Sequence, residues 1–168
     1  MIRFADRLQA ARLLSRLLED FVPQSDVVVL ALRQRAVPIA LEITSALGAT
    51  AGLLTECPRL QGRTVILVDA GIDDAARDNA AIVALRRQKP TRIVIAAPVA
   101  SRAASREVAR TADGCVCLAT PHPFHSISFW YDDSARWART DATGVRRSAA
   151  SRAGGSGDEY TVPRHRIS

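Results

Sequence analysis

Residues 62–72 read Gly-Arg-Thr-Val-Ile-Leu-Val-Asp-Ala-Gly-Ile, and the apolar run at their centre decides the fold. Residues 64–68 are β-branched or leucine and show no polar alternation, which is typical of a strand buried on both faces of a parallel sheet. Similar runs occur upstream at 26–32 (Asp-Val-Val-Val-Leu-Ala-Leu) and downstream at 92–98 (Arg-Ile-Val-Ile-Ala-Ala-Pro). Three such runs predict the centre of a parallel sheet.

Helical patterns alternate with these strands. Helices are predicted over residues 5–20, 38–48, 75–88 and 101–111. Two shorter apolar pieces, 51–55 and 114–118, predict further strands. Strands that alternate with helices imply right-handed crossovers, because parallel neighbours need a connection across the sheet. The sequence therefore predicts an α/β fold with a doubly wound, mostly parallel five-stranded sheet.

The length of 168 residues is enough for one domain with a sizeable core. From about Thr140 the composition turns to Ala, Ser, Gly and Arg, which bury little surface. We therefore expect a domain over residues 1–135 and a flexible C-terminal tail over residues 136–168.

Charge and cysteine content limit the partners and the cellular compartment that we expect. The 23 basic and 17 acidic residues give a formal net charge of +6, but they form no basic cluster with interleaved aromatics, so nucleic acid is not the expected partner. No apolar run is long enough to cross a membrane, and the charged first 20 residues do not resemble a secretion signal. The three cysteines provide no disulfide framework. We expect a reduced, cytoplasmic protein.

Ligands of open parallel sheets bind beyond the carboxyl ends of the strands, where the strand order reverses. Two loops are therefore candidates for a site: residues 33–36 after the first strand and residues 70–77 after the third. The third strand ends in an acid, Asp69.

Residues 62–72 also resemble the signature segment of type I phosphoribosyltransferases. They are most similar to bacterial phosphoribosyltransferase-domain proteins that open with Phe-x-Asp-Arg, here residues 4–7. Other matching pieces follow in the same order, at residues 30–32, 37–40, 42–48, 95–99, 112–118 and 129–131. Together they cover roughly residues 4–135. The resemblance implies a phosphoribosyltransferase-like fold. It also implies transfer of a phosphoribosyl group from 5-phosphoribosyl-1-diphosphate (PRPP), accompanied by Mg²⁺, to a base or related nucleophile.

The resemblance assigns roles by position. Asp69 would be the catalytic acid that holds the ribose. The PRPP loop would comprise Gly71, Ile72, Asp73, Asp74, Ala75, Ala76 and Arg77. The diphosphate loop would comprise Arg33, Gln34, Arg35 and Ala36, and the base side Phe129, Trp130 and Tyr131. No metal ligand of the protein itself is assigned.

Three departures from the family pattern predict impaired catalysis. Ala70 replaces a second acid, and residues 74–77 (Asp-Ala-Ala-Arg) replace the Thr-Gly-x-Thr turn that wraps the 5-phosphate. Residues 33–36 lack the two glycines of the family's Pro-Arg-Gly-Gly loop. The seven residues 56–62 leave no room for the hood that covers the reacting carbon in the family.

Several alternatives stay open. One alternative is that Asp73 or Asp74 is the N-cap of the next helix. The other is that Arg77 supplies a contact to a phosphate. Residues 129–131 either stack on a base or pack on the sheet. The acids at 69, 73 and 74 are a weaker candidate for magnesium. His122 and His125 are interpreted as exposed turn residues, and Cys115 and Cys117 as small apolar residues on one face of a strand.

The functional alternatives follow from the same residues. The chain is either an impaired phosphoribosyltransferase of nucleotide metabolism or a non-catalytic protein. A non-catalytic protein would bind a nucleotide or anion, or act in regulation or assembly. A third hypothesis is a nucleic-acid accessory protein that uses the basic tail residues 146–166. The expected partner is PRPP or another phosphorylated small molecule, and a homo-oligomer is left open.

Overall fold

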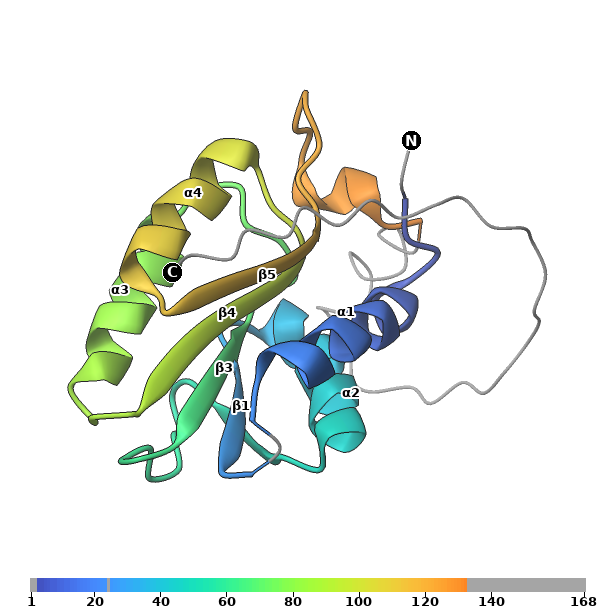
Figure 1. The fold of residues 1–168 in the computed structure, drawn as a ribbon. Coiled ribbons are helices and arrows are strands. Elements are labelled where there is room, and N and C mark those ends of the chain that lie inside the picture. The colour runs from blue at the N-terminus through green and yellow to red at the C-terminus, as the bar shows by residue number, and fades with distance from the viewer. Residues whose placement is uncertain (1–2, 24, 133–168) are drawn as a thin grey trace.

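Five strands form one parallel sheet in the computed structural model, which describes residues 3–23 and 25–132. The strands are β1 (Val27–Ala31), β2 (Thr50–Leu53), β3 (Thr64–Val68), β4 (Arg92–Val99) and β5 (Gly114–Ala119). Their order is β2-β1-β3-β4-β5, and every neighbouring pair is parallel. The predicted doubly wound sheet is confirmed (Figure 1). The predicted tail, 136–168, lies outside the described residues.

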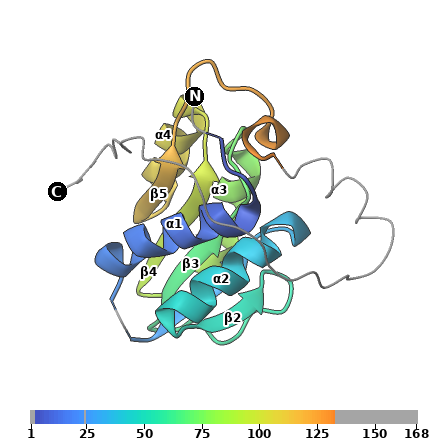
Figure 2. The ribbon, with the colours of Figure 1, turned by 90° about the vertical axis from the view of Figure 1, so that its right-hand side faces the viewer.

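Four helices cover the two faces of the sheet. They are α1 (Arg7–Phe21), α2 (Val37–Leu47), α3 (Ala76–Arg86) and α4 (Arg102–Thr111). Figure 2 shows α1 and α2 together on the face turned to the viewer, and Figure 1 shows α3 and α4 on the other side of the sheet. No helix described within residues 3–23 and 25–132 is long and apolar enough to cross a membrane.

Local sequence signals fix the helix ends. The Asp6 carboxylate accepts a hydrogen bond from the Gln9 backbone at the start of α1, at 2.7 Å, as a helix cap does. Helix α2 has a proline in its first turn and ends at Gly48, whose φ of +59° is the left-handed conformation that glycine adopts without strain. Both α2 signals were visible in the sequence, and the structure confirms them.

Burial on both faces explains the unbroken apolar runs. Every residue of β1 and β3 is buried. Alternate residues point to opposite faces: Val29 and Ile66 pack under α1 and α2, whereas Leu30 and Leu67 pack under α3 and α4. The strands therefore lack polar positions because neither face meets water.

The two ends of the described chain meet above the carboxyl ends of the strands. The Phe4 N–H donates to the Trp130 carbonyl at 2.8 Å, and the Asp132 N–H donates to the Phe4 carbonyl at 2.9 Å. Trp130 closes the short helix η2 (Ile127–Trp130), and Phe4, Trp130 and Tyr131 form a third apolar cluster with Val99. This cluster lies next to the loop after β3 and supports it.

Candidate functional site

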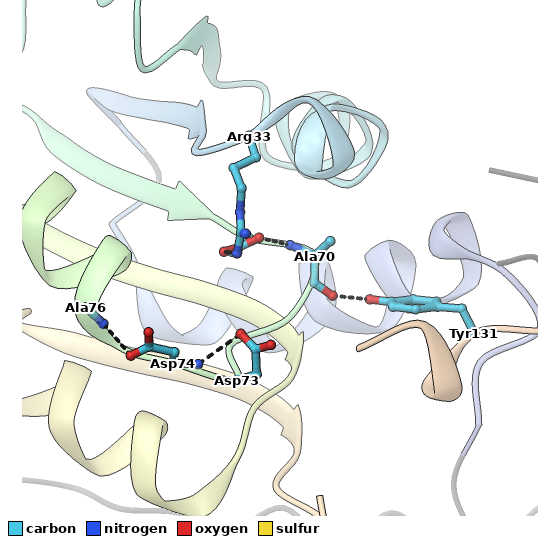
Figure 3. A network of polar contacts seen from close by, with 7 residues as sticks. Arg33, Ala70, Asp73, Asp74, Ala76 and Tyr131 are labelled. Carbon is cyan, nitrogen blue, oxygen red and sulfur yellow. Dashed lines mark hydrogen bonds and ion pairs between the residues drawn. The ribbon is translucent and has the colours of Figure 1, made fainter. Parts of the chain in front are cut away.

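The strand order reverses between β1 and β3, and an ion pair lies at this point. The Arg33 guanidinium, just after β1, donates to Oδ2 of Asp69, just after β3, at 2.5 Å (Figure 3). The two residues are 36 positions apart in the chain. Both loops singled out in the sequence therefore meet where open parallel sheets bind ligands.

The environment of Asp69 makes the ion pair necessary. Its side chain is 2% exposed, and that of Arg33 is 32% exposed. Burial raises the pKa of Asp69, while Arg33 and the N–H groups of Ala70 and Gly71 oppose that rise without cancelling it. Burial also disfavours the charge of Arg33, but the bond to Asp69 and its charge outweigh burial and raise the pKa of Arg33. The guanidinium thus compensates a carboxylate that water does not reach.

Asp78 is a third member of this site, and sequence reasoning missed it. It lies in the first turn of α3, is fully buried, and has no hydrogen-bond donor for either carboxyl oxygen. Burial and then the charge of Asp69 raise its pKa to about 7, and Arg33 opposes the shift. Asp78 therefore lies close enough to Asp69 and Arg33 for its proton affinity to depend on their charges.

A sequence signal for Asp78 does exist. Asp78 shares one face of α3 with Ala81, Ile82 and Leu85, which are three, four and seven positions further on and are all buried. An acid on the apolar face of a helix is costly to bury without a partner. Asp73 and Asp74 lie just before Asp78 in the sequence, and both are exposed. They are therefore the more obvious candidate acids at the start of the helix.

The C-terminal segment bonds to and packs against the loop after β3. The buried Tyr131 hydroxyl donates to the Ala70 carbonyl at 2.6 Å, and the Ala70 N–H donates to Asp69 Oδ1 at 2.7 Å. A Cβ added at Gly71 would lie 2.7 Å from Ile127 Cγ2, so only glycine fits there without movement. The backbone of Ala70 is therefore engaged on both sides (Figure 3).

Asp74 occupies the start of α3. Its Oδ1 accepts a hydrogen bond from the Ala76 N–H at 3.0 Å, and Asp73 Oδ1 accepts one from the Asp74 N–H at 2.9 Å. The N-cap of α3 is Ala75, which has no side-chain cap bond, so the prediction that Asp73 or Asp74 is the N-cap is wrong; Asp74 instead bonds the N–H of the first helical residue. A carboxylate thus accepts from an N–H group of the helix start, the kind of donor that binds phosphates. Arg77 is exposed and lies one position after this capped N–H.

The loop after β1 begins with Arg33 and continues as a short 3-10 helix, η1 (Gln34–Ala36). Gln34 and Arg35 are exposed, whereas Ala36 is fully buried against the core beneath α2. Only Arg33 of this loop reaches Asp69. The loop thus presents side chains, and not glycine backbone, to the edge of the sheet.

The three residues assigned to the base side separate in the structure. Trp130 and Tyr131 are buried, and the Tyr131 ring lies 5.7 Å from the Phe4 ring and 4.7 Å from the Arg7 guanidinium. Phe129 is half-buried and lies 4.5 Å from the His125 ring. Two of the three are therefore core side chains, and Phe129 alone keeps an accessible ring.

Magnesium does not fit the acids of this site. Oδ2 of Asp69 binds Arg33 and Oδ1 binds the Ala70 N–H, and position 70 offers no second carboxylate. Asp73 and Asp74 turn their bonded oxygens to backbone N–H groups. Within the part of the chain that the structure describes, no three His, Cys, Asp or Glu side chains are grouped to hold a metal ion. The Arg33 guanidinium supplies the positive charge next to Asp69.

Two other features have simple placements. His122 and His125 are both exposed, as expected of turn residues. Ten residues, 54–63, join β2 to β3, and Glu56 among them forms an isolated bridge with Leu53 of β2. The connection is short, and that it is too short for a hood stays a prediction.

Solved structures share this architecture, although no family model matches the sequence. TT1426 from Thermus thermophilus superposes with a TM-score of 0.72 at 23% identity, over 77% of this chain and 90% of that one. APRTase from Giardia lamblia, complexed with 9-deazaadenine, gives 0.56 at 15% identity, over 69% and 80%. Purine phosphoribosyltransferase from Pyrococcus horikoshii Ot3 gives 0.52 at 14% identity, over 71% and 93%. The chain therefore has the type I phosphoribosyltransferase fold, as its sequence resemblance implied.

Proposed function

We propose that this protein is a phosphoribosyltransferase-fold protein with impaired transfer activity, which binds PRPP or another phosphorylated small molecule at the carboxyl ends of β1 and β3. One observation carries the proposal: Asp69, the acid expected to hold the ribose, is bound to Arg33. A ribose hydroxyl would have to displace a charge-assisted hydrogen bond, which is about twice as strong as a neutral one.

The helix start supports the same conclusion. The Asp74 carboxylate occupies the Ala76 N–H and places a negative charge where the 5-phosphate would bind. Two like charges about 4 Å apart repel by roughly 1–4 kcal/mol between water-like and surface-like dielectrics. Arg33, Arg35 and Arg77 surround the same edge and supply attraction for an anion, so weak binding survives while efficient transfer does not.

Transfer also requires that water be kept from the reacting carbon. The ten-residue connection between β2 and β3 provides no hood. This absence lowers the rate without preventing ligand binding, because binding uses the loops after β1 and β3.

Calorimetric titration with PRPP, with and without Mg²⁺, tests the proposal together with a turnover assay on a panel of purine and pyrimidine bases. We expect weak PRPP binding that Mg²⁺ does not strengthen and that Arg77→Ala weakens further, and at most slow turnover. Arg102→Ala, at an exposed arginine of α4, is the matched control. Turnover with any base at a kcat/KM of about 10⁴ M⁻¹s⁻¹ or more, or failure of PRPP, inorganic diphosphate and nucleoside monophosphates all to bind, would overturn the proposal.

Restoring the family pattern tests the residue assignments. The quadruple variant Ala70→Asp, Asp74→Thr, Ala75→Gly and Arg77→Thr should bind PRPP more tightly than the parent chain, because it returns the second acid and the phosphate turn. An unchanged affinity in a folded variant would show that the loop after β3 is not the PRPP loop.

A further inference from the structure

Two thiols lie side by side on β5, away from the ion pair of Arg33. Cys115 and Cys117 are two positions apart on the strand, so their side chains point to the same face. Their sulfur atoms are 3.7 Å apart and share a hydrogen bond. Both side chains are half-buried against the apolar cluster under α3 and α4.

The two thiols are not equivalent. The hydrogen bond from Cys117 lowers the pKa of Cys115, and burial opposes this effect. The same bond, followed by burial, raises the pKa of Cys117. Asp78 is the charged group that acts on both, and its negative charge raises each pKa. Cys115 is therefore the first of the two to become a thiolate, with Cys117 holding the shared proton.

We propose that Cys115 and Cys117 form a peroxide-reactive dithiol that closes into an intramolecular disulfide. The strand places their Cα atoms about 6.6 Å apart, at the upper end of the usual range for a disulfide. The sulfur atoms are 3.7 Å apart, and closure must also draw the two Cβ atoms together, which bends β5 locally. β5 is at an edge of the sheet and pairs with β4 alone among the described strands, so it can adjust without breaking a second ladder.

The chemistry balances without any further reactant. The Cys115 thiolate attacks one oxygen of a hydroperoxide, the O–O bond breaks, and the sulfur becomes a sulfenic acid. The released hydroxide or alkoxide takes the proton of Cys117 and leaves as water or an alcohol. The Cys117 thiolate then attacks the sulfenic sulfur and releases hydroxide, which takes up a proton from solvent. The two thiols lose two electrons, and the hydroperoxide gains them.

A disulfide that bends the strand is strained, so an external thiol should reduce it readily and the modification should be reversible. Cys57 provides an internal reference in the same chain. It lies between β2 and β3, and burial raises the pKa of its thiol, so it should react slowly.

The test treats the full chain with hydrogen peroxide, blocks the remaining thiols by alkylation and maps the peptides by mass spectrometry. We expect a Cys115–Cys117 disulfide that dithiothreitol reverses, formed at least about 10-fold faster than Cys57 is oxidised. In Cys117→Ser, oxidation should stop at a Cys115 sulfenic acid, which a dimedone probe traps. Cys115→Ser should abolish the fast phase.

Cys57→Ser is the matched control and should leave the fast phase unchanged. Circular dichroism of each variant shows whether it is folded, and the parent chain alone suffices if one is not. Oxidation of all three thiols at similar rates, or a fast phase that yields only intermolecular disulfides, would overturn the proposal.

Discussion

The guanidinium of Arg33 binds the carboxylate of Asp69 across the point where the strand order reverses between β1 and β3. Open parallel sheets bind ligands at this point, and here two side chains of the protein meet there. The charges of Arg33 and Asp69 also act on the buried Asp78. The stability of this edge therefore depends on three charged or titratable groups.

Removing Arg33 should destabilise the protein. In Arg33→Ala, the buried Asp69 loses its cation. Breaking a fully buried pair costs about 3–5 kcal/mol, and the partial exposure of Arg33 reduces the expected loss in the free energy of unfolding to about 2–3 kcal/mol at pH 7. Urea unfolding measures this loss in the free energy of unfolding. The loss should shrink at low pH, where a protonated Asp69 needs no partner.

A double-mutant cycle separates the ion pair from other effects of the substitution. In an Asp69→Asn background, Arg33→Ala should cost much less, because the buried charge is already gone. Arg102→Ala should change stability by no more than about 0.5 kcal/mol. Equal losses in both backgrounds would show that Arg33 acts by packing and not through Asp69.

Asp78 should make the protein less stable as pH rises. Its pKa is about 7 in the folded chain against an ordinary value of 3.8, so the native state holds the proton more tightly than the unfolded state. Stability then falls between about pH 4 and pH 7 and levels off above, with an upper bound of about 4 kcal/mol for this shift. Asp78→Asn should flatten this part of the profile.

Urea unfolding at several pH values between 4.5 and 8.5 tests this prediction. The gain from Asp78→Asn should be largest at the alkaline end and smallest at pH 4.5. Asp74→Asn, at an exposed acid one turn earlier, is the control and should leave the slope unchanged. Parallel profiles for the parent chain and Asp78→Asn would contradict a raised pKa for the buried Asp78.

The sequence was sufficient for the fold because both faces of β1 and β3 are buried, which leaves an unmistakable apolar run. Topology alone brings the two candidate loops together, so the sequence also predicted that they would meet. The contacts between their residues depend on tertiary distances that no local pattern records. Tyr131 and Ala70 are 61 residues apart, and nothing in residues 33–36 indicates that Arg33 rather than Arg35 bonds Asp69.

Asp74 should stabilise α3 and oppose anions at the same time. Asp74→Ala removes the acceptor for the Ala76 N–H and should lower the free energy of unfolding by about 1 kcal/mol. Asp74→Asn keeps an acceptor but removes the charge, so stability should be nearly unchanged. Its affinity for inorganic phosphate should rise roughly 5-fold, the equivalent of about 1 kcal/mol of repulsion.

Asp73→Asn provides the matched comparison for Asp74. Its carboxylate bonds only the adjacent Asp74 N–H, so the substitution should change phosphate affinity less. Calorimetry with inorganic phosphate and urea unfolding supply the two readouts. A phosphate affinity that rises equally in both variants would mean that net charge, and not the position of Asp74, controls the anion.

Tyr131 should stabilise the loop after β3 by bonding it to the C-terminal segment. Tyr131→Phe keeps the ring against Phe4 but leaves the buried Ala70 carbonyl without the hydroxyl, which should cost about 1–2 kcal/mol of stability. The loss should concentrate in the loop, because the Ala70 carbonyl is the group released. Hydrogen exchange of the amides at Ala70, Gly71 and Ile72 should therefore accelerate more than that of β4. Uniform acceleration across the sheet would show that Tyr131 stabilises the domain as a whole and leaves the loop no looser than the rest.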